Sequence, residues 1–298
     1  MKSLRLLFAA IILAGNATAQ VAPQNPIKLV FWNAEWFPGG SPEATPAEAE
    51  AQTAILVPAL ASLKPDIVGL EEIRDWAASE TAIKGIPGMS IQVCSDYSYE
   101  SGEKSTQQVA IASKKPAIGA WWELWTAGDK VTPRRGFSFA AFQPAPGQVL
   151  LVYCVHLKSN RGSLKQNVPE REESVRQLLS HIAAMEKAYA PLGAVSIVVG
   201  GDFNTSLDDP KFSHEKTLKL LEEAGFQSCW KDVAFADRVT LPSSPSKNPK
   251  YPPFPDACFD HVYVKGAKVL SASVGVFDPA PSDHRPVVVD IALPAASR

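Results

Sequence analysis

Apolar segments of strand length recur along the whole chain, and this recurrence constrains the fold more than any other feature. We expect strands near residues 27–33, 66–72, 90–94, 107–112, 137–142, 149–156, 195–202, 258–264, 268–276 and 287–292. Many of these segments are apolar on both faces, so each strand must be covered on both sides by other layers of structure.

Helical patterns separate some of these strands. Thr45-Pro46-Ala47-Glu48 supplies an N-cap, a proline at the first helical position and a capping-box glutamate, and Pro58 can kink the helix that follows. Apolar residues recur at helical spacing over about 170–189, and a shorter helix over about 213–224 ends at Gly225. The pattern predicts an α/β fold with two stacked sheets flanked by helices. A single doubly wound sheet is the alternative, which the hairpin-like region 137–156 disfavours.

The first residues have the layout of a secretory signal. Lys2 and Arg5 precede an apolar core over 6–14, and the small residues 17–19 offer a cleavage point. The apolar run is shorter than the ~20 residues that a spanning helix needs, so a retained membrane anchor is the weaker alternative. We therefore expect a signal peptide over 1–19 and one large domain over 20–298. The product would be a secreted or periplasmic monomer without stable membrane insertion.

Charge and cysteine content limit how the protein can bind a phosphate ester and which metal sites it can contain. Loss of residues 1–19 would remove Lys2 and Arg5 but no acid, so the formal net charge would go from −2 to −4. A mildly acidic chain does not bind polyanions through bulk charge, so a phosphate ester would need local residues or a metal. Four cysteines permit two disulfides in an exported chain, or they are buried thiols. The sequence has no CxxC or Cys/His cluster, which argues against a zinc or iron–sulfur site.

Polar side chains adjoin the expected strands at six places, mostly at their carboxyl ends. The six groups are Asn33 and Glu35; Glu71 and Glu72; His156, Lys158 and Asn160; Asp202 and Asn204; Asp260 and His261; and Ser282, Asp283 and His284. Residues i and i+2 of an extended chain point to the same side, so Asp202 and Asn204 can face one spot while Phe203 packs away. Ligands collect at the carboxyl ends of parallel strands, and six such places indicate one shared site.

Six motifs occur in a fixed order: FWNAEWF, PDIVGLEEI, VHLKSN, GGDFNT, FDHVYV and SDHRPVV. In this order the chain resembles the endonuclease/exonuclease/phosphatase superfamily, which includes type-I deoxyribonucleases, abasic-site endonucleases, inositol-polyphosphate 5-phosphatases and neutral sphingomyelinases. The match spans nearly all of the chain after residue 19. The resemblance implies a four-layer α/β sandwich, as in deoxyribonuclease I, that cleaves phosphate esters with a divalent metal.

The resemblance implies a metal site made of oxygen ligands. Glu72 closes its motif and is the expected ligand, while Glu71 is a neighbour. Glu35 supports the metal, Asn33 holds a metal ligand or a phosphate oxygen, and Asp283 approaches from the far side. Such a set suits Mg²⁺ or Mn²⁺, and Ca²⁺ in a secreted setting.

The resemblance also implies roles for the reacting groups. Asp202 orients and helps to deprotonate the attacking water, and Asn204 holds the phosphate or that water in line; the alternative for this pair is an Asx turn that merely ends the strand. Asp260 pairs with His284, which either stabilises charge on the phosphoryl oxygens or accepts the proton of the water. His156 donates to a phosphoryl oxygen or to the leaving group.

Residues around the reacting groups complete the expected site. The expected substrate contacts are Arg135, Lys158 and Asn160, with Arg134 as a rival to Arg135. In deoxyribonucleases the counterpart of His156 leans on a glutamate, and the nearest position here offers Gln107 or Gln108.

Two further histidines have simpler expected roles. His181, in the long helix, is expected at the surface, and His261 is expected to point away from Asp260.

The substrate must be read from residues outside the catalytic set. The segment 241–258 carries Lys247, Lys250, Tyr251 and Phe254 and either contacts a nucleic acid or forms a rigid proline-rich cover. The tryptophans of WWELW (121–125) stack on a substrate if exposed, but a place in the core is favoured.

Three classes of function follow. The leading hypothesis is a secreted endonuclease that acts on DNA or RNA. A phospholipid phosphodiesterase or a sugar- or inositol-phosphate phosphatase is the second hypothesis. A binding protein on an inactive scaffold is the third, and the presence of every reactive residue disfavours it.

Overall fold

The computed structural model describes residues 26–98, 101–244 and 255–295. The strands are β1 (Ile27–Phe37), β2 (Ile67–Ile73), β3 (Ser90–Cys94), β4 (Gln108–Ser113), β5 (Gly119–Leu124), β6 (Gly136–Phe142), β7 (Gly147–His156), β8 (Gly193–Asp202), β9 (Gln227–Ser228), β10 (Asp260–Lys265), β11 (Lys268–Val274) and β12 (Val287–Ala292). The α-helices are α1 (Pro46–Ser62), α2 (Trp76–Ile83), α3 (Leu164–Tyr189) and α4 (Thr217–Glu223), and the 3₁₀ helices are η1 (Ala190–Leu192), η2 (Pro210–Phe212) and η3 (Phe235–Asp237). The expected signal segment 1–19 and residues 245–254 of the proline-rich loop lie outside these ranges.

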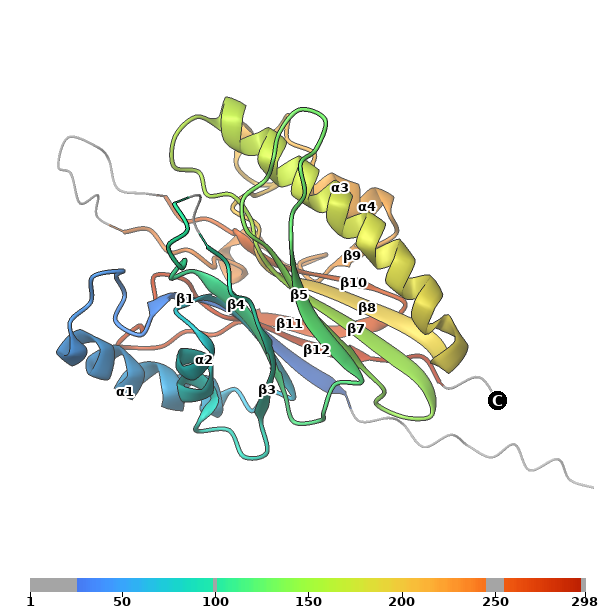
Figure 1. Ribbon diagram of the computed structural model, residues 1–298, viewed down its shortest axis with the longest axis horizontal. Coiled ribbons are helices and arrows are strands. Elements are labelled where there is room, and N and C mark those ends of the chain that lie inside the picture. The colour runs from blue at the N-terminus through green and yellow to red at the C-terminus, as the bar shows by residue number, and fades with distance from the viewer. Residues whose placement is uncertain (1–25, 99–100, 245–254, 296–298) are drawn as a thin grey trace, which may run out of the picture.

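The strands form two six-stranded sheets. The first has the order β11-β12-β1-β2-β4-β3 and the second the order β5-β6-β7-β8-β10-β9. Figure 1 shows α1 and α2 on one side of the paired sheets and α3 and α4 on the other. Each sheet contains one parallel pair at its centre, β1 with β2 and β7 with β8, while its other pairs are antiparallel. The fold is therefore the expected four-layer α/β sandwich.

Three buried clusters hold these layers together. One fills the space between the two sheets and includes Phe31, Ile111 and Val152. A second joins α3 and α4 to the second sheet, and a third joins α1 and α2 to the first sheet. Every central strand thus buries both faces, which explains why so many strands lack apolar–polar alternation.

The expected strands are all present, and several helical details differ from the expectation. Helix α3 begins at Leu164 instead of about 170, because Ser163 caps its first turn and Pro169 is accommodated within the helix. Helix α2, strand β5 and the short β9 were not expected. Trp121 and Trp122 in β5 are half-buried and pack on Phe139 and Tyr97 respectively, and Trp125 is buried, so the core interpretation of the tryptophans is confirmed.

The four cysteines, Cys94, Cys154, Cys229 and Cys258, are buried and free, so they are packed thiols instead of two disulfides. Within the described ranges, no helix combines the length and the apolar character needed to cross a bilayer.

Candidate active site

The candidate site lies where the strand ends of both sheets meet. Asn33 ends the regular part of β1 and Glu72 lies near the end of β2, while His156 and Asp202 end β7 and β8. The sheet register pairs His156 with Asp202, and it pairs Asp202 with Asp260 on the antiparallel β10. Strand β12 runs antiparallel to β1, so the segment before it brings His284 to the same edge.

Local backbone bends turn several of these side chains into the site. Within the described residues, seven non-glycine residues have positive φ, and five of them surround this site: Glu35, Trp36, Glu72, Arg135 and Asn204. Such conformations are sparsely populated for residues with a side chain and are retained where the surrounding structure stabilises them.

The bend at Glu72 is a β-bulge. The pairing of β2 with β4 passes from Glu71 to Ile73, so Glu72, with φ of 54°, has no partner in the ladder. Glu71 stays in the regular strand, fully buried between the sheets, where the Cys154 thiol donates to its Oε1 at 3.1 Å. The bulge therefore separates two adjacent glutamates: one faces the core, and the other faces the site.

Asp202 lies at the centre of the site. Its Oδ2 accepts hydrogen bonds from Asn33 Nδ2 at 3.2 Å and from Asn204 Nδ2 at 3.0 Å. The Nε2 atoms of His156 and His284 lie 3.6 and 4.0 Å from the same oxygen. Burial, and then the charge of Asp260, raise the pKa of Asp202 to about 7.

His284 and Asp260 form a buried pair. His284 Nδ1 lies 2.8 Å from Asp260 Oδ2, which directs Nε2 toward Asp202. Burial alone would lower the pKa of His284, but Asp260, with smaller contributions from Asp202 and Asp283, raises it well above its usual value. Asp260 therefore favours the protonated form of the imidazole.

His156 is also buried, but its pKa is shifted in the opposite direction from that of His284. Its Nε2 lies 3.7 Å from Glu72 Oε1, and its Nδ1 has no hydrogen-bond partner among the described residues. Burial, and then the charges of Arg135 and His284, hold its pKa well below the usual value, so the ring is neutral.

Neither of the two glutamines considered as a partner of His156 contacts it. Gln107 accepts a hydrogen bond from Arg135, and Gln108 accepts from Ser95 Oγ and from the backbone of Tyr97. Neither glutamine therefore takes the place of that glutamate beside His156.

The four expected metal residues occupy two positions. Asn33 donates through Nδ2 to Glu72 as well as to Asp202, so it holds two acidic side chains together. Glu35 and Asp283 lie at the rim, where Glu35 Oε2 accepts from the backbone of Asp283 and the Asp283 side chain is exposed. Burial, and then Asp283, raise the pKa of Glu35 to about 7.

The expected substrate residues lie beside the site but already have protein partners. Arg135 donates to the carbonyls of His156 and Leu157, and Asn160 donates to the carbonyl of Asn204 at 2.7 Å. Lys158 lines an adjoining cavity, and its Nζ lies 3.4 Å from the carbonyl of Ser159.

The sequence did not reveal one residue that organises these loops. Arg171 is fully buried in α3 and forms a two-pronged ion pair with Glu215, while its Nη1 donates to the Lys158 carbonyl and to Asn160 Oδ1. The available signal was a charged residue at helical spacing from the apolar residues Val175, Leu178 and Ile182.

His181 was expected at the surface and is instead largely buried. Its side chain is 12% exposed, packs edge-on against Phe137 and lies 3.1 Å from the Tyr153 hydroxyl. His261 points away from Asp260, as expected, and its Nε2 lies 3.0 Å from the Thr205 carbonyl.

The donor set fits a divalent cation. Asp202 and Asp260 offer carboxylate oxygens that lie within 4.8 Å of each other and of a ring nitrogen of His284. Glu72 adjoins this group through Asn33 and His156, and Asp260 Oδ1 is buried with no hydrogen-bond partner among the described residues. Carboxylates packed this closely repel one another, and a cation would offset that repulsion.

Comparison with protein families gives one match. A sequence model of the endonuclease/exonuclease/phosphatase family matches residues 30–284. No curated protein sequence matches the chain significantly.

Several solved structures share the fold. An endonuclease/exonuclease/phosphatase from Beutenbergia cavernae is 18% identical with a TM-score of 0.66, and the alignment covers 92% of this chain and 73% of that protein. The human Nocturnin catalytic domain, solved with a sulfate anion, is 16% identical with a TM-score of 0.64 and coverage of 90% and 95%. D. rerio TDP2, solved with a single-stranded DNA product, is 17% identical with a TM-score of 0.64 and coverage of 90% and 100%. At these identities the likeness shows the fold alone.

Proposed function

Because the chain belongs to the endonuclease/exonuclease/phosphatase family, we propose that it is a divalent-metal-dependent phosphodiesterase that acts on nucleic acid. The observation that carries this proposal is the convergence of Glu72, His156 and His284 on Asp202, which brings together side chains from both sheets. A carboxylate that can accept a proton, two imidazoles and a carboxylate that can hold a metal lie around one point, and phosphate ester hydrolysis can use each of these groups.

The opposite pKa shifts of the two imidazoles give them different roles. His284, whose protonated form Asp260 favours, stabilises negative charge on the phosphoryl oxygens. His156 is neutral and donates one hydrogen bond through Nε2 to a phosphoryl oxygen, so it is not the acid that protonates the leaving group. Of the two roles considered for His284, the raised pKa supports the stabilising one.

Asp202 is the general base for the attacking water. A base works best when its pKa lies near the working pH, and the pKa of Asp202 is raised to about 7. Asn204, whose amide lies 3.0 Å from Asp202, holds the water or the phosphate in line.

Glu72, whose Oε1 accepts a hydrogen bond from Asn33, would hold the metal, and Glu35 would support it from the rim. Oxygen ligands favour Mg²⁺ or Mn²⁺, with Ca²⁺ as a further candidate. Members of this family generally use divalent metals, and a bound ion would neutralise charge on the phosphate.

Nucleic acid is the substrate class favoured by the surroundings of the site. TDP2, which shares the fold, was solved with a single-stranded DNA product. Basic side chains line a cavity that adjoins His156 through Lys158. The proposed setting is extracytoplasmic, either secreted or periplasmic, and it is supported by the signal-like segment 1–19.

One experiment separates the candidate substrates. The purified protein is incubated with plasmid DNA, RNA, sphingomyelin vesicles and a soluble phosphomonoester, with Mg²⁺ and again with a chelator. We expect nicking of DNA that chelation abolishes. Turnover of lipid or monoester without nicking would contradict the nucleic acid assignment and support the second hypothesis.

Two variants test the assigned roles. Asp202→Asn and His284→Ala should each lower turnover by ~10²-fold or more, because each removes a group that moves a proton or stabilises charge. His214→Ala, at an exposed position, is the matched control and should leave turnover unchanged. Near-normal activity in either test variant would overturn its role.

A further inference from the structure

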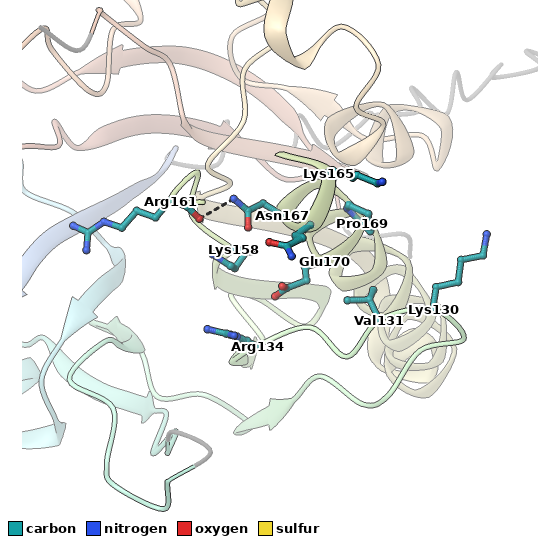
Figure 2. A pocket seen from close by; sticks show the side chains of 10 residues that line it. Lys130, Val131, Arg134, Lys158, Arg161, Lys165, Asn167, Pro169 and Glu170 are labelled. Carbon is teal, nitrogen blue, oxygen red and sulfur yellow. Dashed lines mark hydrogen bonds between the residues drawn. The ribbon is translucent and has the colours of Figure 1, made fainter. Parts of the chain in front are cut away.

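A basic cavity adjoins the active site. It has a volume of about 550 Å³ and is bounded by the β5–β6 connection, the loop after β7 and the first turns of α3. Its charged lining residues are Lys130, Arg134, Lys158, Arg161, Lys165 and Glu170. We refer to it below as the basic cavity (Figure 2).

The basic cavity concentrates positive charge in a chain that is acidic overall. The whole chain has 29 basic and 31 acidic residues, yet five basic side chains and only one acidic side chain line this cavity. None of the five forms an ion pair with a described residue. A group of basic side chains without acidic partners creates a local positive potential, which attracts an anion.

Lys158 experiences this crowding most directly. Burial lowers its pKa, Glu170 opposes this effect, and Arg134, Arg135 and Arg171 lower the pKa further. Arg161 is directed away from the other labelled basic side chains (Figure 2). Its guanidinium lies over the Trp36 ring, 5.6 Å from the ring centroid.

The basic cavity is rigidly connected to the catalytic residues. Lys158 lies two residues beyond His156, which is at most about 7 Å along an extended chain. The buried Arg171 binds the Lys158 carbonyl and Asn160, and Asn160 in turn binds the carbonyl of Asn204. The N-terminal end of the 26-residue helix α3 adds a favourable dipole for an anion.

We infer that the basic cavity binds a phosphate group of the substrate strand next to the scissile one. This inference rests on the proposed function and narrows it to a substrate with at least two phosphates, namely a polynucleotide. The acidic chain has no bulk attraction for such a strand, so the local cluster supplies the attraction where the strand leaves the active site.

Binding can be tested without catalysis. A fluorescein-labelled single-stranded DNA oligonucleotide is titrated with protein in the presence of a chelator, and its anisotropy is followed over a range of salt concentrations. The double variant Lys130→Gln/Lys165→Gln should weaken binding ~10-fold at low salt. The slope of the logarithm of the binding constant against the logarithm of salt concentration should become shallower by roughly 1 to 2, because phosphate contacts are lost. Unchanged binding by this double variant would overturn the inference.

The control lies on the same helix. Lys187→Gln removes one basic side chain about 33 Å along α3 from Lys165. It should bind the oligonucleotide as the unaltered protein does. An equal loss of binding in the control would show general charge attraction and would also overturn the inference.

Turnover of two substrates distinguishes this inference from the proposed function. For the oligonucleotide, the double variant should raise KM and leave kcat unchanged, because the lost contact is made equally in the ground and transition states. Bis(p-nitrophenyl) phosphate has one phosphate that does not reach the basic cavity, so its kcat/KM should be retained. A parallel loss on both substrates would contradict a separate phosphate subsite.

The two ideas can fail independently. If the protein hydrolyses neither substrate but the double variant still weakens oligonucleotide binding, the proposed function is wrong and the subsite remains. If the protein hydrolyses both substrates and the double variant behaves as Lys187→Gln does, the subsite is wrong and the proposed function remains.

Discussion

Asp202 and Asn204 meet through a bend that follows the strand. Strand β8 ends at Asp202, and Phe203 turns into the core beneath α3 and α4. Asn204 then adopts φ of 53°, and its backbone N–H donates to Asp202 Oδ1 at 2.7 Å. This is an Asx turn, so the two interpretations of the motif, a turn and a site, apply to the same residues. The alternation of an extended strand explains Asp202 and Phe203 but not Asn204.

His181 gives a prediction at the scale of one residue. Burial lowers its pKa below the usual 6.5, and Glu123 partly opposes this effect. Below pH 6.5 the unfolded chain therefore binds more protons at this position than the folded chain does, so stability falls as the pH falls. Urea unfolding at about pH 7.5 and about pH 5.5 should show a smaller loss of stability on acidification in His181→Gln than in the unaltered protein.

The partner carboxylate provides the control for His181. Glu123 lies 3.3 Å from His181 Nε2 and favours the charged imidazole. Glu123→Gln should therefore make the loss of stability on acidification steeper. If the free energy of unfolding depends on pH equally in His181→Gln and in the unaltered protein, the predicted contribution of His181 to stability is wrong.

Helix α3 connects the two loops that follow β7 and β8. Arg171 and Glu215 form hydrogen bonds of 2.7 and 2.6 Å, with side chains 0% and 2% exposed. The remaining donor of Arg171 holds the loop that carries Lys158 and Asn160. Arg171 is thus a positioning residue. It touches no reacting group, but it binds Asn160, which in turn donates a hydrogen bond to the Asn204 carbonyl.

Arg171→Met gives a prediction at the scale of the element. Removing one partner leaves the Glu215 carboxylate buried and unpaired, which costs about 3–5 kcal/mol of stability. The double variant Arg171→Met/Glu215→Met should recover most of that loss, because both charges are gone. Turnover should stay low in the double variant, because the loop still lacks its donor. The measurements are urea unfolding and kcat, and recovery of both would show a purely structural role.

Most helices and strands match the hydrophobic period of their sequence, and the elements that differ from the expectation do so for identifiable reasons. The apolar repeat predicts α3 only from about 170 because its members begin at Val175, whereas the Ser163 cap extends the helix to Leu164. Strand β5 was missed because a run of tryptophans does not show which faces are covered. Only its pairing with β6 and its contacts with Phe139 and Tyr97 identify it as a strand.

At the scale of the whole molecule, the site depends on two sheets being packed together. Glu72 comes from the first sheet, while His156 and Asp202 come from the second. The interior between the sheets is closely filled: a Cβ at Gly69 would lie 2.3 Å from the Phe31 ring, and a Cβ at Gly200 would lie 2.6 Å from the same ring. The geometry of the site therefore depends on the complete fold.

Metal binding should stabilise the whole molecule. A ligand that binds only the folded state adds about 2.7 kcal/mol at 100 times its Kd, so saturating Mg²⁺ should raise Tm by several degrees over the value in chelator. Glu72→Gln should remove most of that rise, because it removes a charged ligand. Glu223→Gln, at an exposed position in α4, should keep it. Equal rises in both variants would exclude Glu72 from the metal site.

The strands, most of the helices and the residues that gather in the site were determined by the sequence itself. Periods of 2 and 3.6 are local properties, and the motifs place reactive side chains at strand ends, so both can be read along the chain. The tertiary structure decided the ion pair of Arg171 with Glu215, because the two residues are far apart in sequence. It also decided the basic cavity, because the local sequence around its basic residues does not distinguish them from ordinary surface charges. The bulge that turns Glu72 away from Glu71 was decided in the same way, since a positive φ is stabilised only by the packing and hydrogen bonds of neighbouring strands.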